Sequence, residues 1–242
     1  MASETSLSII VPVLNEEELL GEFLQDLRRV APFAEIIVVD GGSRDATRVI
    51  AKGAADIVLA APRGRALQMN AGAATARGEV LWFLHADVKV PGSAVADIAA
   101  AMRDPRVVGG CFRLRFPPRP VVYRISDSLG NLGVEICGFT LGDHGIFCRR
   151  TAFAAAGRYR NLPILEDAEL SRALRKLGRT VQLRTAISCS PRTFEKRGPW
   201  RTTLVYFSIL ALYVLGVPIS ALHRIYCWFA EDAPRDLVHA TP

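Results

Sequence analysis

Short apolar runs alternate with longer amphipathic stretches along the first half of the chain. The runs are too short for helices and rich in β-branched residues, so they predict buried strands at residues 7–14, 36–39, 56–59 and 80–84. The stretches between and after them predict helices from Asn15 to near Pro32 and at residues 45–52, 66–76 and 93–102. Strands that are apolar throughout are typical of parallel sheets covered on both faces. The pattern therefore predicts an α/β, Rossmann-like, mostly parallel sheet with helices on both faces.

The first predicted helix carries its own start signal. Asn15 is a candidate N-cap, and Glu18, three residues later, completes a capping box. Leucine and phenylalanine then recur at helical spacing, which gives the helix one apolar face. We expect this face to pack against the sheet.

The regular alternation of predicted strands and helices ends after residue 106. A strand at 107–115 leads to a proline-rich break at 116–120, and helices follow at 123–132, 151–156 and 166–177. A glycine-punctuated segment covers 138–147, and a last strand covers 180–188. We expect one domain over residues 1–200, with a first half at about 6–116 and a second half at about 117–200. A hydrophobic appendage at 201–230 and a tail at 231–242 complete the chain.

Residues 202–222 contain no charged side chain, which is long enough for a membrane span on length alone. Gly216 and Pro218 interrupt the run, so two shorter C-terminal hydrophobic helices are the better interpretation. Basic residues lie on both sides of it, which leaves no orientation signal. Residues 202–229 are expected to pack on the domain, to form a homodimer contact or to lie on a membrane surface.

Composition narrows the class of protein. Half of the 242 residues are hydrophobic, which excludes a disordered chain, and the net charge of +6 favours an anionic partner. The five cysteines have no CxxC pair and no zinc-ligand spacing, so we expect reduced thiols in a cytoplasmic protein. The polar N-terminus shows no signal peptide. The predicted location is the cytoplasm, with peripheral contact at the inner face of the membrane as an alternative.

Charged side chains stand where predicted strands end. Asp40 and Asp87 follow two of the strands, and Arg63 and Arg65 lie in a basic turn after a third. Ligands bind at the carboxyl ends of such strands, where arginine can clamp a diphosphate and a carboxylate can hold Mg²⁺ or Mn²⁺. Each residue taken alone could instead be a helix cap or a turn acid. Together they suit a nucleotide diphosphate.

A third acidic position is Glu166-Asp167 at the start of a predicted helix. Acids at this point are favoured by the helix dipole, so a capping role is one interpretation. The other is that Asp167 acts as a general base, which takes the proton from an acceptor hydroxyl as its oxygen attacks a sugar carbon.

These motifs, in their order, resemble the family-2 inverting glycosyltransferases of GT-A fold. The matching segments are Val11-Pro-Val-Leu-Asn-Glu-Glu17, Val39-Asp-Gly-Gly-Ser-Arg-Asp-Ala-Thr47, Arg63-Gly-Arg-Ala66 with Asn70-Ala-Gly72, Leu84-His-Ala-Asp87 and Glu166-Asp167. Gly142-Asp-His-Gly-Ile-Phe147 and 162–170 are similar to a small bacterial group, transferase 2, associated with radical-SAM and selenium-domain proteins and also labelled arsenosugar biosynthesis glycosyltransferases. We infer no arsenic or selenium substrate from that genomic label.

The resemblance implies a role for each matching residue on the donor side. Pro12, Val13 and Glu16 would line the nucleoside pocket, Asp40 would bind the base, and Arg65, with Arg63 as a second candidate, would meet the diphosphate. Asp87 matches the metal-binding acid of the DxD motif, and Mg²⁺ or Mn²⁺ is the implied cofactor. His85 stands where the first acid of that motif is expected, so it is a ligand of the metal, ribose or phosphate or a plain strand-end histidine.

On the acceptor side, the resemblance implies that Asp167 is the catalytic base, with Glu166 as the second candidate. Arg197 and Trp200 are similar to an element that closes over the diphosphate, and Asp143 and His144 are acceptor-side candidates. The implied reaction moves a sugar, expected to be UDP-linked, to the hydroxyl of a small molecule or lipid.

Four other classes of protein compete with this one. A nucleotidyltransferase would also use metal-binding acids but usually has a glycine-rich phosphate loop, which Pro12-Val-Leu-Asn-Glu16 lacks. The absence of GxGxxG after the first strand disfavours a dinucleotide oxidoreductase. A non-catalytic nucleotide-sugar binding protein would use the acids only as caps. Nucleic acid is not an expected partner, because the arginines of the second half have no aromatic stacking platform among them.

Overall fold

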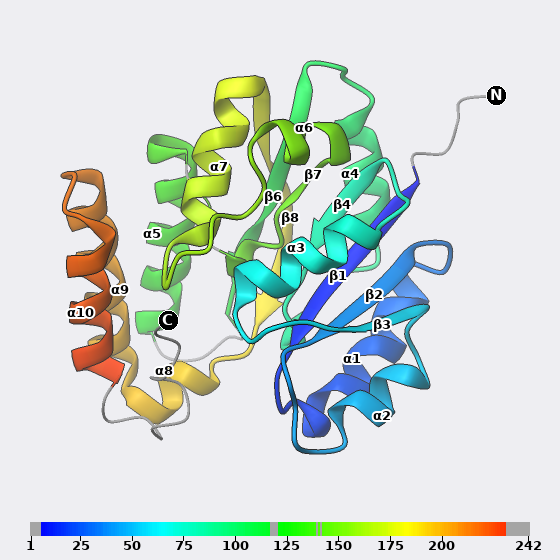
Figure 1. Ribbon diagram of the computed structural model, residues 1–242. Coiled ribbons are helices and arrows are strands. Elements are labelled where there is room, and N and C mark those ends of the chain that lie inside the picture. The colour runs from blue at the N-terminus through cyan, green and yellow to red at the C-terminus, as the bar shows by residue number, and fades with distance from the viewer. Residues whose placement is uncertain (1–5, 117–120, 139, 141, 231–242) are drawn as a thin grey trace.

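An eight-stranded mixed sheet forms the centre of the molecule in the computed structural model, which describes residues 6–116, 121–138, 140 and 142–230 (Figure 1). The strand order is β3-β2-β1-β4-β7-β6-β8-β5. The strands are β1 (Leu7–Val13), β2 (Glu35–Asp40), β3 (Ile57–Ala60), β4 (Val80–Phe83), β5 (Val88–Lys89), β6 (Val107–Arg115), β7 (Phe147–Arg149) and β8 (Arg179–Cys189). The first four strands of the order are parallel, whereas β7 is antiparallel to both β4 and β6. The carboxyl ends of β1, β2 and β4 therefore lie on one edge.

Helices cover both faces of the sheet, as the pattern predicts. They are α1 (Glu17–Val30), α2 (Thr47–Lys52), α3 (Arg65–Thr75), α4 (Ala94–Met102), α5 (Val121–Cys137), α6 (Arg150–Ala155), α7 (Glu166–Leu177), α8 (Arg192–Arg197), α9 (Pro199–Val214) and α10 (Ile219–Ala230), with a 3₁₀ turn η1 (Gly142–His144). Ile9 and Val11 of β1 join the core under α1 and α4, and Ile10 joins the core under α3 and α7. Alternate residues of one buried strand thus supply two cores.

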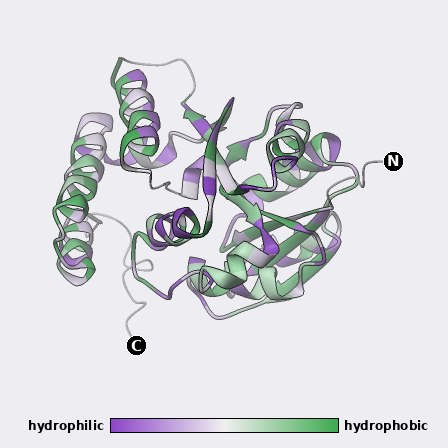
Figure 2. Ribbon diagram, turned by 90° about the horizontal axis from the view of Figure 1, so that it is seen from above, coloured by the Kyte–Doolittle hydropathy of each residue, from purple (hydrophilic) through white to green (hydrophobic). Residues whose placement is uncertain are grey.

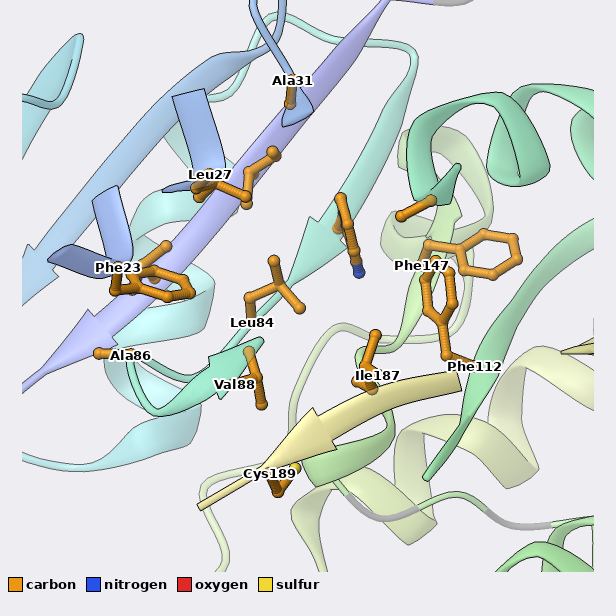
Figure 3. Close-up of a cluster of buried hydrophobic side chains, with 14 of the residues drawn as sticks. Phe23, Leu27, Ala31, Leu84, Ala86, Val88, Phe112, Phe147, Ile187 and Cys189 are labelled. Carbon is orange, nitrogen blue, oxygen red and sulfur yellow. The ribbon is translucent and has the colours of Figure 1, made fainter. Parts of the chain in front are cut away.

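The core on the α1 side continues across the sheet to β8 (Figure 3). The ring of Trp82 stacks on Phe112 with a centroid separation of 5.3 Å, and Phe112 meets Phe147 at 6.0 Å. Leu84 and Val88 continue this cluster on either side of His85 and Asp87. The chain that carries these two polar residues is therefore held by buried neighbours.

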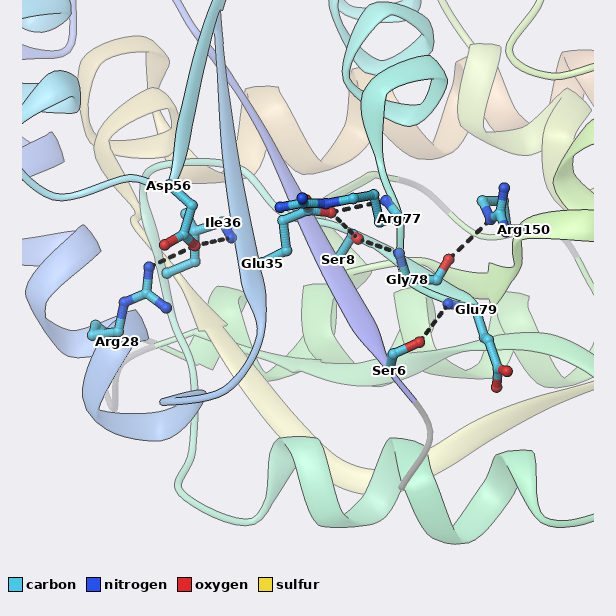
Figure 4. A network of polar contacts seen from close by, with 10 residues as sticks. All are labelled: Ser6, Ser8, Arg28, Glu35, Ile36, Asp56, Arg77, Gly78, Glu79 and Arg150. Carbon is cyan, nitrogen blue, oxygen red and sulfur yellow. Dashed lines mark hydrogen bonds and ion pairs between the residues drawn. The ribbon is translucent and has the colours of Figure 1, made fainter. Parts of the chain in front are cut away.

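Charged residues at the opposite end of β1 are paired with one another (Figure 4). The Ser8 hydroxyl donates to Glu35 at 2.6 Å and accepts from the Gly78 N–H at 2.8 Å. The Arg77 guanidinium lies 2.7 Å from Glu35. The polar groups at this end of β1 therefore bond to one another and stabilise the fold. The carboxylates at the carboxyl edge are not paired with one another in this way.

The predicted capping box at Asn15 and Glu18 is wrong. The N-cap of α1 is Glu16, with no side-chain capping bond, and Asn15 has a left-handed φ of 53°. The Asn15 side-chain oxygen accepts from the N–H of Arg44 at 2.9 Å, and its own N–H donates to the Ser43 hydroxyl at 2.9 Å. Asn15 therefore joins the loops after β1 and β2, because a long-range partner replaces the local cap.

Two helices separated by a turn occupy the C-terminal apolar run, as predicted. α9 ends at Val214, Gly216 has a φ of 85°, and α10 begins at Ile219. Within the described residues, no helix has the length and apolar character needed to cross a membrane. The predicted tail at 231–242, the first five residues and most of the proline-rich break lie outside the described residues.

Cys111, Cys148 and Cys189 are buried thiols in the part of the chain that the structure describes, and the reduced state stays a prediction. The short elements β5, β7 and α8 have no counterpart in the pattern analysis. Strands of two and three residues are too short to show a period, so only their pairing with β8, β4 and β6 identifies them.

Candidate functional site

The ends of β1 and β2 are tied together by Gln68 of α3. Its side-chain amide donates to the carbonyl of Val13 at 2.9 Å and to the carbonyl of Val39 at 2.8 Å. A Cβ on Gly41 would lie 2.9 Å from the Gln68 side chain, so glycine is needed for this close approach. The bonds place the start of α3, and with it Arg65, beside the two strand ends.

Asp40 lies at the end of β2 and is 3% exposed. Its Oδ1 accepts from the N–H of Ser43 at 3.0 Å and from the Ser43 hydroxyl at 2.5 Å, which fixes the side chain at the mouth of the turn. Pro12 and Val13 are buried on the neighbouring strand. The structure therefore brings together three of the four residues predicted for the nucleoside side, Pro12, Val13 and Asp40.

Glu16 and Asp87 come together through Arg192, the first residue of α8. The Arg192 guanidinium lies 3.5 Å from the Glu16 carboxylate. Burial raises the pKa of Glu16, Arg192 lowers it, and Asp87 raises it again. Burial and the charge of Asp143 raise the pKa of Asp87, while His85 and Arg192 lower it. Arg192 thus links the loops that follow β1 and β4.

His85 has a buried Nε2 atom without a hydrogen-bond partner among the described residues. Burial and the positive charge of Arg65 lower its pKa, so the imidazole is held neutral. A Cβ on Gly142 would lie 2.7 Å from this Nε2 and 2.5 Å from Oδ2 of Asp167. Gly142 therefore leaves a small space that both side chains face, and any larger residue would fill it.

Asp167 is the second residue of α7 and is 5% exposed. Burial and the neighbouring Glu166 raise its pKa to about 8; Arg65 acts in the opposite direction, and Asp143 adds to the rise. The Arg65 Nε lies 3.8 Å from the Glu166 carboxylate. A carboxyl group in this environment exchanges a proton near neutral pH, which is what a general base requires.

The Asp167 side chain makes no capping bond. α7 starts after Leu165, whose φ is 63°, and α7 has no side-chain cap within the described chain. Oδ1 of Asp167 and the hydroxyl of Tyr159 are both buried, and neither makes a hydrogen bond of ordinary geometry within the described residues; the Tyr159 hydroxyl lies close enough to lower the pKa of Asp167. A buried polar atom without a well-formed hydrogen bond destabilises the fold, so these two atoms at a strained helix start point to a site for another molecule.

Asp143 connects these groups electrostatically. It is exposed on η1, and its charge raises the pKa of both Asp87 and Asp167. We call Asp87, Asp143, Glu166 and Asp167 the carboxylate cluster. His144 beside it is 2% exposed, and its Nδ1 lies 3.1 Å from the carbonyl of Phe112, which is a structural contact.

The donor atoms of Asp87, Asp143 and His85 suit Mg²⁺ or Mn²⁺, since both bind carboxylate oxygens and Mn²⁺ also accepts imidazole. The unpartnered Nε2 of His85 fits such a role. Across the described residues, no group of three or more His, Cys, Asp or Glu side chains is placed to hold a metal ion. A metal at this place would need ligands beyond these described side chains.

The sequence model of Glycosyl transferase family 2 matches residues 8–157, which hold the strand ends, Asp40, Arg65, His85 and Asp87. The chain belongs to this family.

Curated relatives and solved structures agree with this family. Two undecaprenyl-phosphate 4-deoxy-4-formamido-L-arabinose transferases of Pseudomonas fluorescens are similar to this chain. The protein of strain Pf-5 is 32% identical over 38% of this chain, and the protein of strain Pf0-1 is 29% identical over 59% of it. The chain spans 31% and 45% of the length of these relatives. Mannosyltransferase PcManGT from Pyrobaculum calidifontis, in complex with GDP-Man and Mn²⁺, superposes with a TM-score of 0.61 at 18% identity, over 94% of this chain and 70% of that one.

A second solved structure is glucosyl-3-phosphoglycerate synthase from Mycobacterium tuberculosis, in complex with Mn²⁺, UDP and glucosyl-3-phosphoglycerate. It has a TM-score of 0.60 and 16% identity and covers 88% of this chain and 81% of that one. At such identities the likeness establishes the fold, which is the GT-A fold expected from the sequence. The comparisons support the family and leave the radical-SAM-associated subgroup a prediction.

Three further residues predicted for this family 2 site stand in other segments of the chain, Arg197 at the end of α8, Trp200 in α9 and Arg63 before α3. The Arg197 guanidinium lies over the ring of Phe229 in α10, with Cζ 5.4 Å from the centroid. Trp200, at the start of α9, is 62% exposed, and Arg63 is exposed in the loop before α3. The roles of these three residues stay predictions.

Sequence reasoning missed Arg192, Gln68, Tyr159 and Gly142. Arg192 stands in a basic segment that follows a strand, and Gln68 is the polar residue on the inner face of a helix of small residues. Both signals are visible in the sequence, but neither names a partner. Tyr159 carries no local signal. Gly142 opens a segment that resembles the bacterial subgroup, but its closeness to His85 and Asp167 depends on residues distant in the chain.

Proposed function

We propose that the protein is an inverting glycosyltransferase that moves a sugar from a nucleotide diphosphate sugar, with UDP as the expected nucleotide, to an acceptor hydroxyl. The observation that carries the proposal is Asp167, a buried carboxyl group with a pKa of about 8 and an oxygen atom without a well-formed hydrogen bond among the described residues. It lies next to Arg65, a cation at the start of α3. A base and an anion-binding group in one place are what sugar transfer from a diphosphate requires.

The proposed reaction is a single displacement. Asp167 accepts the proton of the acceptor hydroxyl as its oxygen bonds to the anomeric carbon. The bond between that carbon and the diphosphate oxygen breaks, and the electron pair leaves with the nucleoside diphosphate. Because the new bond forms on the face opposite the old one, the configuration inverts. Arg65 stabilises the negative charge that develops on the leaving group.

Asp87, with His85 as a second ligand, would hold Mg²⁺ or Mn²⁺. The metal would supply positive charge that neutralises the diphosphate. Arg192 keeps the Glu16 carboxylate beside Asp87, and the neutral imidazole of His85 retains a lone pair for a ligand.

The nucleoside would lie over the ends of β1 and β2. Pro12 and Val13 supply an apolar wall there, and Asp40 is held at the turn by Ser43, from where it would bind the base. Glu16 would complete the pocket. Arg63, Arg197 and Trp200 are candidates for further contacts to the diphosphate.

The C-terminal helices are proposed to make peripheral contact with the inner face of a membrane. Leu204 of α9, Leu215 directly after it and Trp228 of α10 are exposed apolar side chains that support this assignment. The leftmost helix of the ribbon coloured by hydropathy is mostly green to white (Figure 2). The relatives' names specify a lipid-linked substrate, undecaprenyl phosphate, which is consistent with work at such a surface.

A thermal-shift screen tests the donor assignment. The melting temperature is measured with UDP, GDP, ADP, CDP and TDP, each with and without Mn²⁺. A ligand at 100 times its Kd stabilises by about 2.7 kcal/mol, which raises the melting temperature of a chain of this size by roughly 5–10 °C. We expect one nucleotide to give a selective, Mn²⁺-enhanced shift.

Asp26→Asn changes an exposed ion pair on α1 and is the matched control for the variants that remove an acid of the site, Asp40→Ala, Asp87→Ala and Asp167→Asn. Its melting temperature should shift with nucleotide as the parent's does. If no nucleotide shifts the parent, the proposal fails. If a nucleotide binds but the matching sugar nucleotide is never cleaved, the chain is a nucleotide-sugar binding protein. Release of pyrophosphate from a nucleoside triphosphate would identify a nucleotidyltransferase instead.

A further inference from the structure

An apolar groove runs between α5 and α9, which lie side by side at the left of the molecule (Figure 1). Its volume is about 300 Å³, at the lower end of the range for small-molecule sites. Its walls are apolar side chains and glycines of α5 and α9, closed at the base by Phe116 and Phe194. We call this cavity the α5–α9 groove.

One end of the groove reaches the carboxylate cluster at Asp143. Asp143 and His144 line this end, and the charge of Asp143 raises the pKa of Asp167. A molecule that fills the groove therefore has one end beside Asp143. This continuity separates the α5–α9 groove from the larger cavities of 610 and 520 Å³, whose described lining residues include no member of the carboxylate cluster.

The rim of the groove is apolar and exposed. Leu132 is 47% exposed, Ile136 71% and Val214 57%, and all three line the cavity. When hydrocarbon covers such side chains, burial of their apolar surface is favourable by about 25 cal/mol per Å². A hydrocarbon chain can thus continue from the groove onto the outer surface of α5 and α9.

The α9 wall is coupled to the helix that carries Asp167. The Tyr213 hydroxyl donates to Glu169 of α7, and Ala168, fully buried, packs in one cluster with Ile209 and Leu222. An occupant that presses on α9 therefore acts on the start of α7.

The charges of the residues that line the groove indicate which head group its occupant carries. Among the described residues that line the groove, the titratable side chains are Asp143, His144 and Tyr206, and no lysine or arginine is present. Phosphate groups in proteins are bound by arginine, lysine or N–H groups, and a carboxylate repels them. An ionised phosphate also has no proton that a base at Asp167 would need to remove.

We propose that the acceptor is an amphipathic alcohol whose hydrocarbon chain lies in the α5–α9 groove and whose hydroxyl reaches Asp167. The inference rests on the proposed function and adds the class of acceptor. The acceptor O–H proton passes to Asp167, the oxygen–carbon bond forms, and the carbon–diphosphate bond breaks with its electrons on the diphosphate. The acceptor thus differs in its head group from the undecaprenyl phosphate in the relatives' names.

Gly133→Leu tests the groove, because a Cβ on this glycine would meet no heavy atom within 4 Å and the residue lines the cavity. Gly92→Leu is the matched control, since Gly92 has the same free space outside the groove. The measurement is equilibrium dialysis of labelled n-decanol, with n-decyl phosphate as a second probe. Ala211→Leu, on the facing helix, replaces Gly133→Leu if that variant melts below the parent.

We expect saturable decanol binding to the parent and Gly92→Leu, and binding weakened about tenfold in the groove variant, equivalent to roughly two displaced methylenes. Decyl phosphate should bind more weakly than decanol. Equal binding by all variants, no saturable binding by the parent, or tighter binding of decyl phosphate would each overturn the inference. Nucleotide-induced thermal shifts on the same preparations test the proposed function separately, because groove variants should retain them.

Discussion

Replacement of Asp167 by asparagine separates its proposed role as a base from a structural role. The amide keeps the size of the side chain but cannot accept the proton, so turnover should fall by about 10²- to 10⁴-fold. Turnover is followed as release of nucleoside diphosphate, with water or an alcohol as acceptor. Binding of donor and metal should persist, because neither is assigned to Asp167.

The pKa of Asp167 also sets the pH dependence of the parent. With a pKa of about 8, raised by burial and by Glu166, roughly one tenth of the carboxyl groups are ionised at pH 7. Because the base must be ionised, kcat/KM should rise about tenfold between pH 7 and pH 9. Glu166→Gln removes a negative neighbour, so it should move this rise to lower pH and reduce turnover less than Asp167→Asn does.

The pH dependence of the melting temperature is a second measurement. Ionisation of Asp167, which should raise activity, should lower stability. The pKa of Asp167 is raised above its ordinary value of 3.8, so the bound proton favours the folded state most at low pH. That contribution is lost as pH rises from about 4 through about 8. Asparagine carries no charge at any pH, so Asp167→Asn should melt at or above the parent, and its advantage should grow up to pH 9.

The reasoning would be refuted by an Asp167→Asn protein of near-parental activity, or by one whose melting temperature falls below the parent's at pH 9. A capping role makes a different forecast, since asparagine caps helices about as well as aspartate and both turnover and stability would then survive. Both quantities should be measured on one preparation.

The other predictions concern the donor, the metal and the C-terminal helices. Asp87→Ala should abolish the Mn²⁺-dependent part of nucleotide binding. It should leave the melting temperature nearly unchanged, because the side chain adds little to the core. Unchanged Mn²⁺ and nucleotide affinities, measured by calorimetry, would contradict the metal assignment. Asp40→Ala should weaken nucleotide binding with or without metal, and an unaltered dissociation constant would remove its role at the base. Carbonate or high salt should release the protein from membranes, whereas a pellet that only detergent dissolves would disprove peripheral contact through α9 and α10.

The periodicity of the chain was sufficient for most elements of the fold. The apolar runs became β1 to β4, and the helix predicted at 166–177 is α7 to the residue. The break at Gly216 and Pro218 divides α9 from α10 as expected. These features follow from the local sequence, because a strand's apolar pattern, a helix's apolar face and a helix stop at glycine or proline need no distant partner.

The site was predicted as a set of residue types but not as an arrangement. The motifs placed Asp40 and Asp87 at strand ends, where the parallel topology brings them to one edge. Their partners were not predictable: Arg192 reaches Glu16 from the far end of the chain, and Asn15 bonds to the loop after β2 instead of capping α1.

What the sequence by itself determined is the fold class, the family and the residues available for chemistry. Only the tertiary structure decided that Asp167 is buried beside Glu166 and Arg65, that Gly142 leaves a space between Asp167 and His85, and that α5 and α9 enclose an apolar groove at Asp143. The physical reason is that burial and Coulomb interactions depend on distances between residues far apart in the chain. A local pattern carries no record of those distances.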